Sequence, residues 1–212
     1  MSELSNFLIN DYATHFGVVW DNTSMFLRTD SPASVRFEIE DQKSEIIQPS
    51  GHGVSVLRRT EDTVEIIDLE YFTKTIHGTS NTPSSCDFAI SPDVGTQFII
   101  FNELTRTESK YILSFTQPST GIEQTGKLEY ARKQLAQTIE RFYSVSNFCD
   151  QFHDKIALFS CRLSDKPSNG IMAKSAKSFN KTIFMLQRLK LRWNLPHGFQ
   201  SHMRVYNIEY RI

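Results

Sequence analysis

The sequence predicts an α/β (α+β) fold in which a central mixed β-sheet is flanked by helices. The chain has 212 residues, of which 39% are hydrophobic and 16 are Phe, and this composition is typical of a packed globular core. Short apolar segments with strand-like patterns follow one another from residue 34 to residue 104. A helical period then begins at Lys127 and another apolar segment follows it, an order that suits a mixed sheet covered by helices.

The first part of the chain predicts one helix followed by three strands. Apolar residues at helical spacing indicate a short helix over residues 2–16. Residues 34–40, SVRFEIE, alternate apolar and charged side chains, as a half-buried strand does. Residues 53–59 and 63–72 are interpreted as two successive strands joined by a polar turn. We therefore assign residues 1–62 to an N-terminal helix with its strands.

The middle of the chain predicts a pair of strands in a hairpin-like connection. Residues 77–85 are rich in turn formers and indicate a loop. The apolar segments 86–90 and 98–104 follow, and Pro92 and Gly95 between them favour a turn. For residues 106–126 two interpretations stay open, because KYILSF fits either a further strand or an insertion.

The period changes at Lys127, where an amphipathic helix of about four turns is expected. Its apolar residues recur every three to four positions, at Leu128, Ala131, Leu135, Ile139 and Phe142. A strand over 155–163 completes a core of residues 63–163. A second long helix over 173–193 and a terminal strand over 203–212 are expected to pack on the same domain, as a basic C-terminal part that comprises residues 164–212.

Two of the apolar strands carry an acid, Asp87 at the start of one and Glu103 near the end of the other. An ionised carboxylate buried without a partner is costly, so each acid needs an explanation. One is a strand end that reaches solvent or a salt bridge to Arg106 or Lys110. The other is a divalent metal ion, since Mg²⁺ takes one or two carboxylates together with water and phosphate oxygens.

A third acid would complete such a metal site. Residues 63–70 supply Glu65, Asp68 and Glu70, and strand alternation puts Glu65 on the face opposite to the other two. The first helix also offers Glu3 and Asp11. We prefer Glu65 as the third ligand, with a solvated strand face as the alternative for each acid.

The order of these elements resembles the core of the PD-(D/E)XK phosphodiesterase superfamily, the restriction-endonuclease-like fold. The resemblance covers about residues 63–163 and rests on Asp87 in CDFAI, on Glu103 and Thr105 in FIIFNELT, and on the helix KLEYARKQLAQTIERF with Gln134. It implies a restriction-endonuclease-like core, Mg²⁺ or Mn²⁺ as cofactor, and hydrolysis of DNA or RNA. It also implies a place in bacterial defence or restriction assemblies, including antiviral defence.

Thr105 departs from the family pattern, which has lysine at this position. The lysine of active members is expected to position the attacking water and offset charge in the transition state, and threonine supplies no positive charge. Lys110, Lys127, Lys133 and Gln134 are candidates for the vacant role. The alternative to an enzyme is a catalytically inactive scaffold with the same fold.

The C-terminal part is basic. From Lys174 to Ile212 the chain has eight basic residues and one acid, so this part carries +7 and the preceding part −8 within a net charge of −1. On the predicted helix the cations form one stripe, which we interpret as a surface for the nucleic-acid backbone or for an acidic protein: Lys174, Lys177, Lys181, Arg188 and Arg192. The alternative is docking on the acidic part of the same chain or of a neighbouring subunit.

Other sites and locations are not indicated. No secretory signal or membrane-spanning run is expected, and the three cysteines form no CxxC pair, so we expect a cytoplasmic protein. The partners expected are nucleic acid and a protein or second copy, with no membrane. A third hypothesis is an unrelated α+β interaction domain whose Asp87 and Glu103 are strand-end charges.

Overall fold

The structure, a computed structural model, describes residues 1–18, 27–41, 43–60, 63–80, 82–117, 119–164, 193–206 and 208–212. Among them a six-stranded mixed sheet has the order β1-β5-β6-β7-β10-β11. Its strands are β1 (Thr29–Asp30), β5 (Val64–Asp68), β6 (Phe88–Pro92), β7 (Phe98–Thr107), β10 (Asp154–Leu163) and β11 (Gln200–Val205). The pairs β1–β5, β5–β6 and β6–β7 are antiparallel, whereas the pairs β7–β10 and β10–β11 are parallel. The mixed central sheet expected from the sequence is thus confirmed.

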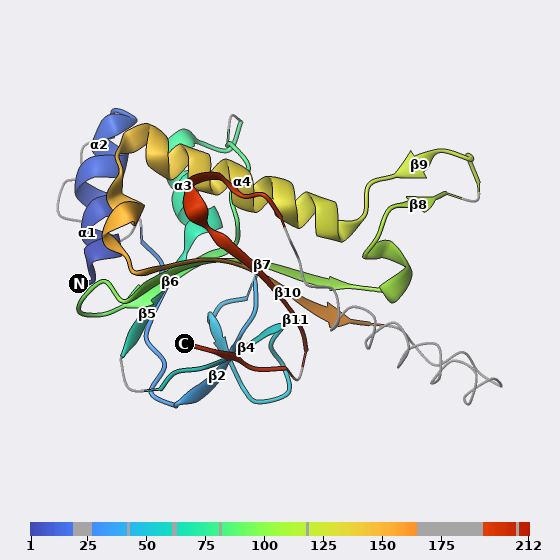
Figure 1. The fold of residues 1–212 in the computed structure, drawn as a ribbon, viewed down its shortest axis with the longest axis horizontal. Helices are drawn as coiled ribbons and strands as arrows, with labels where there is room; N and C mark the ends of the chain where they lie inside the picture. Colours follow the sequence, from blue (N-terminus) through green and yellow to red (C-terminus); the bar gives the residue numbers. More distant parts are fainter. Residues whose placement is uncertain are drawn as a thin grey trace.

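A second sheet of four strands lies against one face of the first (Figure 1). Its order is β12-β4-β2-β3, and its strands are β2 (Arg36–Ile39), β3 (Ile47–Gln48), β4 (Ser55–Arg58) and β12 (Tyr210–Arg211). Apolar residues of both sheets, such as Phe37, Leu57, Ile90 and Ile100, form one buried core between them. The strands expected at 34–40 and 53–59 therefore belong to this smaller sheet.

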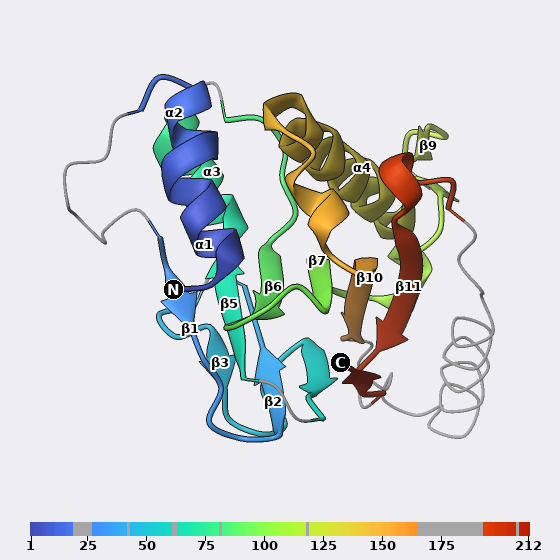
Figure 2. The ribbon, with the colours of Figure 1, turned by 60° about the vertical axis from the view of Figure 1, so that its left-hand side comes forward.

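Helices cover the other face of the large sheet (Figures 1 and 2). The N-terminal helix is continuous from α1 (Glu3–Phe7) through a π-helical segment (Leu8–Tyr12) to α2 (Ala13–His15), and it is followed in the chain by α3 (Leu69–His77) and α4 (Lys127–Val145). Because strand side chains alternate, Ile99 and Phe101 of β7 pack under the helices, whereas Ile100 faces the small sheet. The expected flanking helices are confirmed on this one face.

Two segments differ from the sequence-based prediction. Residues 63–72 do not form one strand, because β5 ends at Asp68 and α3 begins at Leu69. The Asp68 carboxylate caps the helix by accepting a hydrogen bond from the Tyr71 N–H at 2.9 Å, and Leu69, Phe72 and Ile76 are buried on one side of it. The expected terminal strand is also two strands, β11 in the large sheet and β12 in the small one.

Residues 106–126 are an insertion rather than a core strand. β7 extends to Thr107 and is followed by a 3₁₀ turn (Ser109–Tyr111) and a small hairpin of β8 (Phe115–Thr116) and β9 (Glu123–Gln124). The hairpin projects beyond the first turn of α4 (Figure 1). Two further 3₁₀ turns, Phe148–Gln151 and Pro196–Gly198, precede β10 and β11.

The assigned segments are interleaved in space. β1 from the N-terminal segment pairs with β5, and β12 from the C-terminal segment pairs with β4. The helix expected over 173–193 lies outside the described residues, apart from Trp193. Among the residues that the structure does describe, no helix has the length and apolar character needed to cross a membrane.

Candidate metal centre

Asp87 is held between α3 and β7 by main-chain hydrogen bonds. Its carbonyl oxygen accepts from the N–H groups of Leu69 at 2.8 Å and Glu70 at 3.3 Å, at the start of α3. Its Oδ2 accepts from the N–H of Leu104 at 2.6 Å. Only 7% of the Asp87 surface is exposed, so this carboxylate is both buried and fixed in direction.

Glu103 lies within β7, on the face that packs under the helices. It alternates with Asn102, which points to the small sheet and hydrogen-bonds Ser55 there. Only 7% of Glu103 is exposed, and its buried Oε2 atom has no hydrogen-bond partner among the residues that the structure describes. Buried carboxylate oxygens are nearly always paired, so this atom needs an explanation.

Two more acids join this pair from segments distant in sequence. Asp41, Glu70 and Asp87 each offer a carboxylate oxygen within 4.8 Å of the others. Together with Glu103 they line a hollow of about 300 Å³, whose other lining residues are Leu104, Thr105, Lys127, Tyr130, Gln134 and Phe159. We call it the acidic hollow. Four carboxylates thus converge from the loop after β2, from α3, from the start of β6 and from β7.

Local contacts explain how Asp41 and Glu70 reach the acidic hollow. Glu40, the neighbour of Asp41, forms an ion pair with Arg106 of β7, and Arg106 also donates to the His52 carbonyl at 3.1 Å. Glu70 is in the first turn of α3 and pairs with Lys74 at 2.7 Å. The acids are therefore positioned by the packing of their own segments.

Burial and the mutual repulsion of the clustered carboxylates raise the pKa values of Asp87 and Glu103. Burial, followed by repulsion from Asp87, Asp41 and Glu70, raises the pKa of Glu103 to about 10. Burial and the nearby Asp41 raise the pKa of Asp87 well above its ordinary value. Carboxylates that repel each other in a buried site favour the bound proton, and a divalent cation would replace it.

One face of α4 fastens the segment that leads to Asp87. Gln134 Nε2 donates to the Ser85 carbonyl at 3.3 Å, Arg141 donates to the Ser84 carbonyl at 2.5 Å, and the Cys86 N–H donates to the Thr138 hydroxyl at 2.8 Å. These α4 residues are spaced by about one helical turn each, so they lie on one side of the helix. The predicted site residue Gln134 thus lines the hollow and helps to hold the chain next to Asp87.

A buried polar network supports β7 from the opposite face. The Asn102 amide donates to Ser55 at 3.0 Å and accepts from Ser160 at 3.2 Å, and the two serine hydroxyls are 2.9 Å apart. The three side chains are 0–1% exposed. They join β7 and β10 to the small sheet directly behind Glu103 and fix its strand in place.

The structure brings together four of the five residues predicted for the metal site and its chemistry. Asp87, Glu103, Thr105 and Gln134 all line the acidic hollow, as does Lys127. Lys133 is an exposed residue of α4 outside that lining, and Lys110 pairs with Glu108 on the insertion. The predicted basic stripe, Lys174 to Arg192, lies outside the described residues.

Glu65 is not brought to the acidic hollow. Its carboxylate accepts hydrogen bonds from the hydroxyls of Ser2 and Ser5 at the start of α1. In the register of the sheet Glu65 stands opposite Ser91, four residues from Asp87, which corresponds to about 13 Å along a strand. Its place in the acid cluster is taken by Asp41 and Glu70.

The sequence carried a signal for Glu70 that strand alternation concealed. Asp68 followed by buried residues at positions 69, 72, 73 and 76 is the pattern of a capped amphipathic helix. Asp41 had no comparable signal, since it lies in a loop. A comparison of the chain with protein-family models, curated proteins and solved structures finds no match.

Proposed function

We propose that the acidic hollow binds a divalent cation, Mg²⁺ or Mn²⁺, and that the protein hydrolyses phosphodiester bonds in DNA or RNA. The observation that carries the proposal is the buried, unpaired Oε2 atom of Glu103 beside the clustered carboxylates of Asp41, Glu70 and Asp87. Oxygen donors of this kind fit a hard cation. Lys74, which pairs with Glu70, is half exposed.

A bound cation would supply an activated water and balance negative charge on the phosphate. The chain's own residues would orient the reactants around it. Asp87, fixed by the Leu104 N–H, and Glu103 are the buried ligands, whereas the half-buried Asp41 and Glu70 lie nearer to solvent. Lys127 is an exposed residue that lines the same hollow, and its ammonium would face the phosphate oxygens, where the Thr105 side chain supplies only a hydroxyl.

The strand order supports the proposal as well. β5, β6 and β7 form an antiparallel succession, α4 crosses over one face, and β10 returns parallel to β7. This is the order on which the resemblance to PD-(D/E)XK phosphodiesterases rests, and the candidate ligands lie at its centre. The three buried cysteines are unpaired, in keeping with the cytoplasmic location we propose.

The test combines metal binding with cleavage. Calorimetry with Mn²⁺ and Mg²⁺ is expected to show binding to the wild type and its loss in Asp87→Asn and Glu103→Gln, with Glu65→Gln as the matched control. A panel of single- and double-stranded DNA and RNA is expected to be cleaved only by the proteins that bind metal. Metal binding and cleavage that survive both substitutions would refute the proposed site.

Lys127 is tested against another lysine of the same helix. Lys127→Ala is expected to slow cleavage by about 10²- to 10³-fold, which is typical for the loss of one charge-stabilising donor. Lys133→Ala is expected to have no effect, because that side chain is exposed outside the hollow. Equal effects of the two substitutions would exclude a specific role for Lys127.

A second candidate is a catalytically inactive scaffold that binds nucleic acid or a protein partner. Thr105 favours it, since the strand position next to the acids lacks a positive charge. Salt-sensitive oligonucleotide binding without cleavage at any metal concentration would support this candidate over the first.

A further inference from the structure

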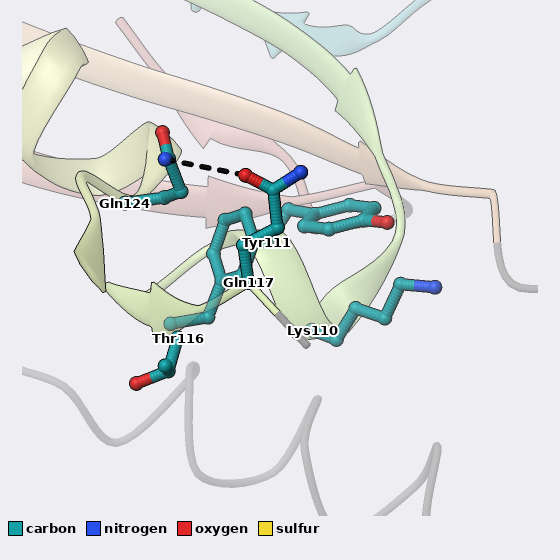
Figure 3. Close-up of a pocket in the computed structure, with 6 residues that line it drawn as sticks. Lys110, Tyr111, Thr116, Gln117 and Gln124 are labelled. Carbon is teal, nitrogen blue, oxygen red and sulfur yellow. Dashed lines mark hydrogen bonds between the residues drawn. The ribbon is translucent and has the colours of Figure 1, made fainter. Parts of the chain in front are cut away.

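The insertion between β7 and α4 contains a second pocket, which Figure 3 shows in close-up. This hairpin pocket has a volume of about 490 Å³ and is lined by Lys110, Tyr111, Phe115, Thr116, Gln117 and Gln124. The rings of Tyr111 and Phe115 meet edge to face with centroids 4.8 Å apart, and Lys110 lies 4.7 Å from the centre of the Tyr111 ring. The side chains of both rings are half-buried.

Two amides complete the pocket. Gln124 Nε2 donates to Gln117 Oε1 at 3.4 Å, drawn as the dashed line in Figure 3. This bond turns the Gln117 nitrogen away from Gln124, so the outer ends of the pair are one donor and one acceptor. The Lys110 ammonium is already paired with Glu108 at 2.8 Å, so the ligand must be recognised by the rings and the amides. A pocket with ring faces and paired amides matches a nucleobase, which has two flat faces and a hydrogen-bonding edge.

The hairpin pocket is close to the acidic hollow. The Leu128 N–H of α4 donates to the Ile112 carbonyl at 3.0 Å, and Gly126 packs so tightly on the backbone of Leu113 that a Cβ would lie 2.2 Å from it. Gln124 of the pocket and Lys127 of the acidic hollow are three residues apart, which places their Cα atoms at most about 11 Å from each other. One lining residue of each cavity is thus found next to the start of α4.

A third aromatic ring belongs to the acidic hollow itself. Tyr130 is one turn into α4, lines the acidic hollow and is 53% exposed. Exposed rings beside a phosphate site are the usual platform for successive bases of an unpaired strand. In a duplex the base faces are covered by their neighbours and are out of reach of such rings.

We propose that the hairpin pocket binds the base of an unpaired nucleotide next to the phosphate held in the acidic hollow, so that the substrate is single-stranded DNA or RNA. The inference rests on the proposed function and adds the class of substrate to it. Tyr111 stacks on the base, and the paired amides of Gln117 and Gln124 meet its edge.

The test measures binding separately from cleavage. Fluorescently labelled single-stranded DNA, single-stranded RNA and duplex of equal length are titrated with the protein in EDTA. Tyr111→Ala is expected to weaken single-strand binding by about 5- to 140-fold, the range for loss of one stacked base, and to leave duplex binding unchanged. The matched variant Tyr111→Phe keeps the ring and is expected to bind like the wild type.

A second variant controls for the possibility that Tyr111→Ala disturbs the fold of the hairpin. Gln117→Ala leaves the rings in place and is expected to change the preference among oligo-A, oligo-C and oligo-T strands. Wild-type affinity of both alanine variants for single strands, or equal affinity of the wild type for duplex, would overturn the inference. The affinities for single-stranded DNA and for single-stranded RNA decide which of the two nucleic acids is the substrate.

The two proposals fail in different ways. If the wild type cleaves with Mn²⁺ and Tyr111→Ala binds single strands as tightly as the wild type does, the proposed function is supported and the role of the hairpin pocket is refuted. Single-strand binding that depends on Tyr111, with no cleavage under any metal, supports the pocket and refutes hydrolysis.

Discussion

Replacing Glu103 by Gln is expected to stabilise the metal-free protein at neutral pH. The substitution keeps the shape of the side chain and removes the need to bind a proton on folding, which burial and three neighbouring acids impose on Glu103. The pKa of Glu103 is raised in the folded state to about 10 from its ordinary 4.5. The folded state therefore binds the proton more tightly than the unfolded state does.

The sign and size of the effect follow from this difference. The stability that Glu103 contributes is fully present below pH 4.5 and is lost as pH rises toward 10, since unfolding then releases the proton. Each pH unit in this window corresponds to about 1.4 kcal/mol, so the wild type loses about 3 kcal/mol between pH 5 and pH 7 through this group. Glu103→Gln does not titrate and is expected to be about 3 kcal/mol more stable than the wild type at pH 7.

The assay is urea unfolding of both proteins in EDTA at pH 5, 6, 7 and 8, with exposed Glu140→Gln as the control for a general change in net charge. A constant m-value with diverging midpoints is the expected result. Added Mn²⁺ is expected to raise the midpoint of the wild type and leave that of Glu103→Gln unchanged. Parallel pH dependence of wild type and Glu103→Gln would refute the reasoning, because the buried carboxyl would then titrate as in the unfolded chain.

Three further substitutions test the contacts around the site, each measured by urea unfolding. Asn102→Ala removes the amide that joins Ser55 and Ser160 and is expected to cost about 2–3 kcal/mol; a loss under about 0.5 kcal/mol would contradict the role of this network. Gly126→Ala places a Cβ against the backbone of Leu113 and is expected to cost about 1–3 kcal/mol, and unchanged stability would show that this close approach is not fixed. Thr138→Val leaves the buried Cys86 N–H without its acceptor and is expected to cost about 1–3 kcal/mol, and unchanged stability would show that another group satisfies it.

Local pattern predicted much of the fold. The period of three to four residues after Lys127 located α4, and the apolar runs around Pro92 and Gly95 located the β6–β7 hairpin. These elements are defined by neighbours in the chain, so their side-chain spacing carries the information. The end of β5 at Asp68 was not predicted because residues 64–72 fit strand alternation as well as a helical repeat. The structure shows the helix start in the hydrogen bond from the Tyr71 N–H to the Asp68 carboxylate.

The sequence by itself predicted that Asp87 and Glu103 lie near each other, because in a hairpin the start of the first strand is next to the end of the second. Only the tertiary structure decided which acids join them. Asp41 arrives through the Glu40–Arg106 pair and Glu70 through the start of α3, whereas Glu65 lies about 13 Å along the sheet and bonds to the N-terminal helix. The physical reason is that the register between strands and the packing of loops set the distances between the acidic side chains. Neither can be predicted from the spacing of residues along one strand.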